Sequence, residues 1–480
     1  MTPPCSLVMA KSLQSQLWTH LFPGDGEEHG AVLVCGVART SRSIRLLGRE
    51  LFPAADGVDY VPGTRGYRML RGEFILDKIL RCREDGLAYL AVHNHGGDDH
   101  VGFSVDDLRS HERGYPALLD VARGQPVGAL VIARRAVAGD IWLSRDIRVE
   151  LAETRILGAG IEPLWSSPPP LPPGRDETYD RQARLFGDAG QALLASAKIG
   201  VIGAGGVGSL LIEYLARLGV GWIVAADPER IDITNLPRVV GSTRFDARTF
   251  LTEAGRPEWI RNIGRRLATP KISIARRLAR RANRRCRLDA IVGDIVERSV
   301  AQRFVDCDYL FLAADTMQAR LVFNALVHQY LIPGVQVGAK VRASAGAGEL
   351  IDVYSVARTV TPDSGCLWCN GLISAEGLQR EAATPRERAA QRYVNDPAVL
   401  APSVITMNAT VASQAANDFM FAWTGLTHDD ATLEYLRFVP RDRDVRFDLP
   451  RADPTCSECG LDPISRRARG NSTSLPTRER

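Results

Sequence analysis

Lys198-Ile-Gly-Val-Ile-Gly203-Ala-Gly205-Gly206-Val-Gly208 is the stretch that decides the fold. A short apolar run leads into four glycines, and residues 206–218 continue with the apolar spacing of a helix. A strand, a glycine turn and a helix in this order let backbone N–H groups approach a phosphate at the helix N-terminus. Asp227 closes the next predicted strand, where nucleotide-binding folds place a carboxylate on the ribose. The stretch therefore predicts a Rossmann-like nucleotide-binding α/β domain.

Outward from the glycines, strands alternate with helices, as in a parallel α/β sheet. We predict strands at 197–202, 222–226 and 309–313, and helices at 206–218, 270–285 and 317–330. The fingerprint alone favours an NAD-dependent oxidoreductase. Further polar residues stand near these elements, and they are Arg181, Asn235, Arg238, Lys271 and Asp315. An NAD site does not need so many, whereas arginine and lysine suit a triphosphate and a carboxylate suits its Mg²⁺.

The order of these motifs over 176–460 resembles the ThiF/MoeB-type adenylyltransferases of the ubiquitin-activating-enzyme superfamily. The matching stretches are YDRQARLFG, VIGAGGVGS, LARLGVG, DPERIDITNLPR and AADTMQAR, together with Lys271. The resemblance implies that Gly203, Gly205, Gly206, Gly208 and Asp227 hold ATP. It also implies that Asn235, Arg238 and Lys271 support the triphosphate, that Asp315 holds Mg²⁺, and that Arg181 reaches the phosphates across a homodimer.

By the same resemblance, the reaction is the adenylation of the C-terminal carboxylate of a ubiquitin-like or sulfur-carrier protein. A conjugating-enzyme-like acceptor would follow. One departure from the family is a longer segment between Arg238 and Lys271, about 243–266, which we interpret as a partner-binding addition.

Four of the nine cysteines form two CxxC pairs, Cys366/Cys369 and Cys456/Cys459. Four thiolates close a tetrahedral structural zinc site. In many activating enzymes a cysteine after the first pair accepts the acyl group, but residues 370–401 contain none. Either the partner attacks the acyl-AMP directly, or a hydroxyl such as Ser374 or Thr384 carries an oxyester.

The N-terminal part carries a second motif. His93-Asn-His95 follows the predicted strand 87–92, and alternation places both imidazoles on one side. Ser104 opens a predicted helix that contains Asp107. Two imidazoles and a carboxylate leave a fourth zinc position for water. The pattern resembles the JAB/MPN (JAMM) metalloproteases, an α+β fold whose members cleave isopeptide bonds to ubiquitin-like proteins.

That resemblance makes His93, His95 and Asp107 the ligands of a catalytic zinc. Glu28 would be the general base, with Glu27 as the alternative, and Ser104 would steady the oxyanion. Gly96 departs from the family, where proline follows the second histidine.

Composition and linkers divide the chain into a JAB/MPN domain (1–163), a Pro-rich linker (164–175), the ThiF/MoeB-type domain (176–460) and a disordered basic tail (461–480). No apolar run is long enough to span a membrane, and the N-terminus shows no secretory signal, so we expect a cytoplasmic protein. The arginine-rich stretch 261–287 lacks interleaved aromatics, so nucleic acid is not predicted.

The two motifs together predict a bifunctional enzyme of a bacterial ubiquitin-like pathway, which activates a modifier and processes or removes it. The alternatives are activation of a sulfur carrier for thiocarboxylate formation, an NAD-binding oxidoreductase and an inactive binding scaffold.

Overall fold

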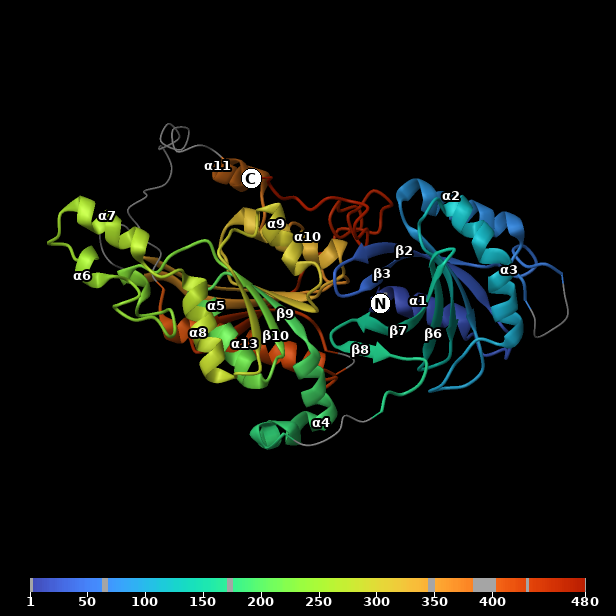
Figure 1. Cartoon of the computed structure of the whole chain (residues 1–480), viewed down its shortest axis with the longest axis horizontal. Helices are drawn as coiled ribbons and strands as arrows, with labels where there is room; N and C mark the ends of the chain where they lie inside the picture. The colour runs from blue at the N-terminus through green and yellow to red at the C-terminus, as the bar shows by residue number, and fades with distance from the viewer. Residues whose placement is uncertain are drawn as a thin grey trace. The chain divides into compact units, whose positions relative to one another are not determined.

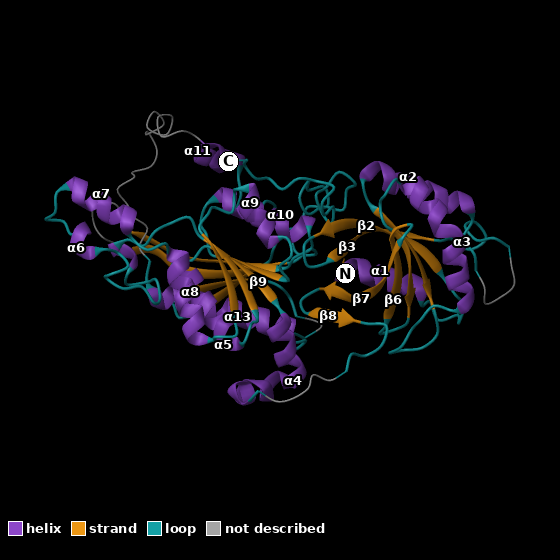
Figure 2. Cartoon of the chain, in the orientation of Figure 1, coloured by secondary structure: helices purple, strands orange, loops and turns teal. Residues whose placement is uncertain are grey.

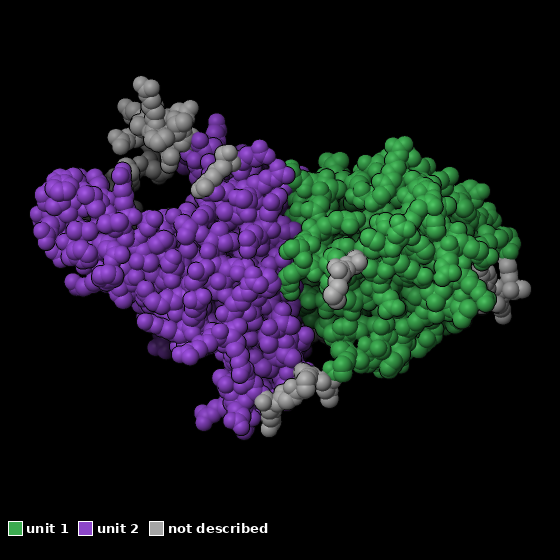
Figure 3. Space-filling model, in the orientation of Figure 1, with its two compact units in different colours: residues 1–171, 328–331, 459–474 green, residues 172–327, 332–458, 475–480 purple. Residues whose placement is uncertain are grey.

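The structure is a computed structural model that describes residues 3–62, 68–170, 176–343, 350–382, 403–428 and 431–479. The chain forms two compact units (Figure 3). Unit 1 contains residues 1–171, 328–331 and 459–474, and unit 2 contains residues 172–327, 332–458 and 475–480. Part of the predicted linker, 171–175, lies outside the described residues.

Unit 1 is built on a mixed eight-stranded sheet with the strand order β1-β3-β2-β4-β5-β6-β7-β8. A further parallel pairing between β1 and β7 closes this sheet on itself. The strands are β1 (Cys5–Ala10), β2 (Gly30–Arg39), β3 (Ile44–Pro53), β4 (Ala88–Asn94), β5 (Val127–Ile132), β6 (Val137–Ser144), β7 (Ile147–Leu157) and β8 (Ile161–Leu164). The strand predicted at 87–92 is thus present as β4.

Three helices cover this sheet: α1 (Lys11–Leu21), α2 (Gly72–Asp85) and α3 (Val105–Ala122). Alternate residues of β2 enter two separate cores, because successive side chains of a strand point to opposite faces. Leu33 packs in the core that contains Leu17 of α1. Val32 packs in the core that contains Ile79 of α2 and Leu119 of α3.

Unit 2 has an eight-stranded sheet in the order β11-β10-β9-β12-β13-β14-β15-β16. Its first five strands run parallel and the rest are antiparallel. They are β9 (Lys198–Ile202), β10 (Trp222–Ala226), β11 (Arg287–Ile291), β12 (Tyr309–Leu312), β13 (Gly334–Ala343), β14 (Leu350–Val360), β15 (Tyr435–Val439) and β16 (Asp444–Asp448). The mixed α/β, Rossmann-like prediction is therefore confirmed for this unit.

Helices cover both faces of the unit 2 sheet: Figures 1 and 2 show α5, α8 and α13 on one side and α9 and α10 on the other. The helical segments are η1 (Glu177–Tyr179), α4 (Asp180–Ser196), α5 (Gly206–Leu218), η2 (Ile233–Asn235), α6 (Thr249–Thr252), α7 (Glu258–Leu267), α8 (Lys271–Ala282), α9 (Arg298–Ala301), η3 (Gln302–Phe304), α10 (Met317–Gln329), α11 (Ala375–Ala382) and α13 (Ile405–Trp423). Among the described residues, we find no helix with the length and apolar character needed to cross a bilayer.

The segment after Gly460 differs from its prediction of disorder. Residues 461–479 are described, and part of this segment packs on the end of β2. β4 pairs with β2 only as far as Cys35, so the backbone beyond it has free hydrogen-bonding groups. The amide of Asn471 donates to the carbonyl of Val37 at 2.8 Å. A side chain at Gly36 would collide with the carbonyl of Ala468. Basic composition suggested disorder, but backbone pairing with an open strand edge orders the segment.

Candidate active sites

The glycine loop lies where the strand order of unit 2 reverses. β9 has β10 on one side and β12 on the other, and such switch points are where α/β sheets bind ligands. The amide of Gly203 donates to Ala226 at the end of β10 (2.9 Å), and the amide of Ala313 donates to Ile202 (2.8 Å). The loop is therefore fixed by backbone hydrogen bonds to both neighbouring strand ends.

Two glycines of the loop are required by its geometry. Gly203 has φ of +95°, in the left-handed region that favours glycine. A side chain at Gly208 would collide with the carbonyl oxygen of Gly203. Gly205, by contrast, faces open space and precedes the first residue of α5, so its backbone is accessible at a helix N-terminus.

Asp227 is buried beneath this loop, with 5% of its surface exposed. Its carboxylate accepts hydrogen bonds from the amide of Ala204 at 2.7 Å and from the amide of Glu229 at 2.8 Å. Burial raises the pKa of Asp227, although both amides and the charge of Lys271 oppose this rise. Lys271 begins α8 and forms an ion pair with Glu229. The predicted ribose and phosphate residues Asp227 and Lys271 thus lie close together.

Arg238 also approaches the loop, since its side chain would contact a Cβ placed on Gly206. The hydroxyl of Ser209 on α5 accepts a hydrogen bond from the amide of Val240 at 3.1 Å, which holds the Arg238 turn against α5. Asn235 is buried, and its side-chain oxygen accepts from the amide of Asp232, so it stabilises the preceding turn.

Asn408 on α13 was not predicted, although its amide nitrogen lies against Gly206. It is buried, with 2% of its surface exposed, and it donates to the hydroxyl of Ser403 at 3.2 Å. Only the tertiary packing of α13 on α5 brings it to the loop. No short-range spacing in the sequence could have identified it.

Asp315 follows β12 and is exposed, close to the same loop, because Ala313 and Ala314 would contact a Cβ on Gly203. Arg320 on α10 is half-buried; burial lowers the pKa of this guanidinium, and the charge of Asp315 opposes the change. Arg181 lies exposed on the first turn of α4. The described part of the chain shows no contact between Arg181 and the loop.

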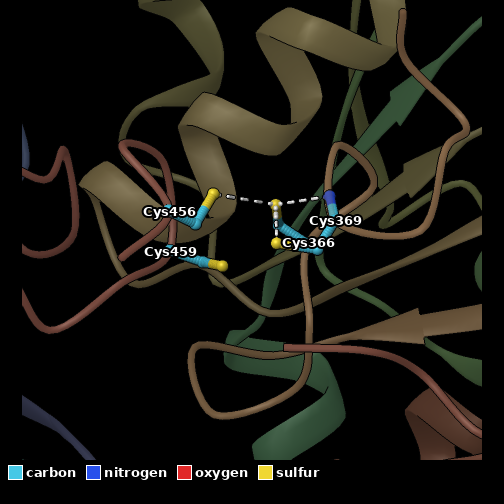
Figure 4. Close-up of side chains that lie close together, drawn as sticks. All are labelled: Cys366, Cys369, Cys456 and Cys459. Carbon is cyan, nitrogen blue, oxygen red and sulfur yellow. Dashed lines mark hydrogen bonds between the residues drawn. The ribbon is translucent and has the colours of Figure 1, made fainter. Parts of the chain in front are cut away.

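The four CxxC cysteines form a compact cluster, and Figure 4 shows the two pairs facing each other. The Sγ atom of Cys366 lies 3.5 Å from the Sγ atom of Cys369 and 3.8 Å from the Sγ atom of Cys456. Tetrahedral zinc with bonds of about 2.3 Å would hold sulfurs about 3.8 Å apart. The amide of Glu458 donates to the Sγ of Cys456. Burial raises the pKa of Cys369 to about 11, a cost that a bound cation would offset. The donor set fits a structural zinc.

Three of the remaining thiols do not suit an acyl carrier. Burial raises the pKa of Cys5, Cys82 and Cys286 to about 12, so the nucleophilic thiolate is disfavoured. Ser374 is half-buried, and its hydroxyl accepts from the amide of Gly377 at the start of α11. Thr384 lies outside the described residues.

Unit 1 gathers a second polar cluster from three separate segments. His93 and His95 come from the end of β4 and the turn after it, and their Nε2 atoms are 3.2 Å apart. Glu28 precedes β2, and its Oε1 lies 3.2 Å from Nε2 of His95. Asp107 on α3 lies 3.7 Å from both imidazoles. We call these four residues the histidine cluster.

Asp107 and Ser104 form a capping box at the start of α3. The Ser104 hydroxyl donates to the Asp107 carboxylate at 2.6 Å. Burial raises the pKa of Asp107, but hydrogen bonds from His93 and Ser104 outweigh it and hold this pKa well below its usual range. His95 donates through Nδ1 to the carbonyl of Gly102 (3.1 Å), and its contact with Glu28 raises its pKa. Second hydrogen bonds of this kind orient metal-binding imidazoles.

A pocket of about 370 Å³ opens beside the cluster and is lined by Glu28, His95 and Arg134, among others. The acidic side chains of the adjoining loop, Asp98 and Asp99, lie close to arginines. Asp99 pairs with Arg135 at 2.7 Å, and Asp98 lies 3.8 Å from Arg134. Glu28, His93 and His95 offer atoms close enough together to hold a metal ion, whereas the expected ligand Asp107 lies outside this group, and so does the half-buried Glu27.

Comparison with known proteins identifies relatives of this chain. A model of the ThiF family matches residues 179–458, more than half of the chain. The chain is 31% identical over 190 residues to the tRNA threonylcarbamoyladenosine dehydratase of Escherichia coli, covering 38% of this chain. It is 28% identical to the sulfur carrier protein ThiS adenylyltransferase of Bacillus subtilis and 26% identical to the SAMP-activating enzyme E1 of Haloferax volcanii, over 40% and 38% of this chain. It spans 61%, 49% and 56% of these three relatives.

Proposed function

The chain belongs to the ThiF family, and on this premise we propose that unit 2 adenylates the C-terminal carboxylate of a ubiquitin-like or sulfur-carrier protein. The observation that carries the proposal is the glycine loop at the strand-order reversal, with Asp227 beneath it and Arg238 and Lys271 close by. The names of the Bacillus and Haloferax relatives support an adenylating function and a small-protein substrate.

In the proposed reaction, a carboxylate oxygen of the modifier attacks the α-phosphorus of ATP, which forms an acyl-AMP and releases pyrophosphate. The loop amides and the N-terminus of α5 would bind phosphate oxygens. Arg238 and Lys271 would offset the negative charge that develops as pyrophosphate leaves. Asp315 would hold the Mg²⁺ ion, which neutralises phosphate charge when bound.

The acyl group would then pass directly to the partner's nucleophile. Supporting this route, residues 370–401 contain no cysteine, and burial raises the pKa of Cys5, Cys82 and Cys286 to about 12. A homodimer would supply Arg181 to the site of the neighbouring copy.

ATP–pyrophosphate exchange with a candidate ubiquitin-fold partner tests this proposal. We expect exchange that requires the partner and falls at least about 100-fold in Asp315→Ala, the order of loss seen when transition-state charge is left uncompensated. Asp363→Ala is a control in another part of unit 2. Tight NAD binding that is indifferent to Asp315 would instead support the oxidoreductase alternative.

For unit 1 we propose a JAB/MPN-type zinc site that processes or deconjugates the modifier. His93, His95 and Asp107 would hold the ion, which supplies an activated water when bound. Glu28 would take the proton of that water, and the hydroxyl of Ser104 would donate to the carbonyl oxygen of the scissile bond. The mutual contacts of the histidine cluster support this proposal.

Together the two proposed sites make a bifunctional enzyme of a ubiquitin-like modification system. Linking them in one chain keeps both activities at high local concentration. Thiocarboxylate formation on a sulfur carrier is the second candidate, supported by the named substrate of the Bacillus relative. The mass of the modifier after incubation with ATP and a sulfur donor distinguishes these candidates.

A further inference from the structure

The exposed side of α8 and the turn after it carry several arginines that the proposed function does not use. Arg276, Arg280, Arg281 and Arg284 are exposed. Together with Ser273 and Arg277 they line a hollow of about 470 Å³. We call these six residues the arginine face.

The positive charge of this face is not balanced within the described part of the chain. Arg277 forms an ion pair with Asp246 at 2.7 Å. The other four arginines have neither an ion pair nor a hydrogen bond to a carboxylate among the described residues. Three carboxylates of unit 2 are paired with other arginines: Glu213 with Arg217, Asp289 with Arg287 and Arg303, and Asp176 with Arg285.

The arrangement also works against the helix that carries it. Arg276 and Arg280 are spaced by four residues on α8, and like charges at this spacing repel on one helix face. A rise of 1.5 Å per residue places them about 6 Å apart along the axis, and Arg284 follows in the turn after the helix. An anion with several charges could contact successive guanidinium groups and remove this repulsion.

We propose that the arginine face binds a small polyphosphorylated anion, at a site separate from the glycine loop. Guanidinium groups match phosphate oxygens in two-pronged hydrogen bonds, and the hydroxyl of Ser273 adds a further donor. The hollow falls within the range of about 300–1,000 Å³ that small-ligand sites occupy. No aromatic side chain lines it to stack nucleobases, which favours a small polyphosphate over single-stranded nucleic acid.

Calorimetric titration with tripolyphosphate tests this site. The full-length chain carries Arg238→Ala throughout, so that the proposed nucleotide site is disabled and its failure does not affect the readout. The test variant adds Arg276→Ala and Arg280→Ala. The matched control adds Arg145→Ala and Arg446→Ala, which removes the same charge from exposed arginines that already have carboxylate partners.

We expect saturable binding at one site per chain, weakened about tenfold or more in the test variant and unchanged in the control. Removing repelling arginines should leave the thermal midpoint of the ligand-free chain at or above its original value. If the alanine variant does not fold, Arg276→Gln with Arg280→Gln replaces it in the same titration.

Absence of tripolyphosphate binding overturns the proposal, and so does binding that falls equally in the control. A 20-nucleotide RNA is titrated in parallel. Loss of RNA binding in the test variant, without any tripolyphosphate binding, would identify a nucleic-acid surface and overturn the small-anion assignment.

Discussion

The glycine loop of unit 2 and the histidine cluster of unit 1 are built in different ways. The loop is fixed by backbone hydrogen bonds and by a carboxylate, Asp227, with 5% of its surface exposed. The histidine cluster consists of side chains that are 19–25% exposed and come from three segments of the chain. The four-cysteine cluster resembles the loop in this respect, since Cys366 is fully buried. Substitutions at the buried positions of the loop or the cysteine cluster should therefore damage the fold, whereas those at Glu28, His93 and His95 should mainly damage chemistry.

The largest effect is expected for Cys366→Ser. Its Sγ lies at the centre of the cysteine cluster, and a structural zinc contributes directly to folding free energy. We expect the loss of one zinc per chain and roughly 4 kcal/mol or more of stability, a drop of about 10 °C in the thermal midpoint. Mass spectrometry measures the zinc content, and calorimetry measures the thermal midpoint.

Cys286→Ser is the control, because this thiol is also buried but lies outside the cluster. It should keep the full zinc content. If the zinc content and the thermal midpoint of Cys366→Ser were unchanged, the cysteine cluster would be two metal-free turns. It would then not support the fold as the glycine loop does.

Within the glycine loop, Gly208→Ala should be destabilising and Gly205→Ala should not. The methyl group at position 208 would collide with the Gly203 carbonyl, and such overpacking costs about 1–3 kcal/mol. Position 205 has open space, so the fold should tolerate the methyl group there. If phosphate binds at the N-terminus of α5, Gly205→Ala should still weaken ATP binding about tenfold. Denaturant unfolding and nucleotide titration separate the two effects.

The same contrast explains which features of the fold and of the sites could be predicted from the sequence alone. The strand, glycine turn and Asp227 are short-range features whose spacing follows from one βαβ unit, so they were predictable. The ordered tail and Asn408 depend on where distant segments pack, on the open edge of β2 and on α5, and no local pattern encodes this. The proximity of Glu28 to His95 required a family resemblance as well as the residues.

In the histidine cluster, Glu28→Gln should strongly slow hydrolysis while the zinc content and the fold stay unchanged. The amide keeps the size of the side chain and a hydrogen bond to His95, but it cannot take a proton. We expect the rate to fall by about 100-fold or more, the usual contribution of a general base. The assay follows cleavage of a short peptide fused to the C-terminus of a candidate modifier. Glu27→Gln is the matched control, and a larger loss there would reassign the base.

The smallest expected effect is the change in unfolding stability caused by His93→Ala, and it is also the sharpest test. The imidazole is 21% exposed, and substitutions at such positions away from a core usually change stability by less than about 1 kcal/mol. After chelation of the zinc in both chains, the unfolding midpoints of His93→Ala and the unmodified chain should therefore agree. With zinc added, only the unmodified chain should bind the second ion and hydrolyse the fusion. A midpoint that falls as far as in Cys366→Ser would mean that the histidine cluster supports the fold, so the distinction between the two kinds of site would be lost.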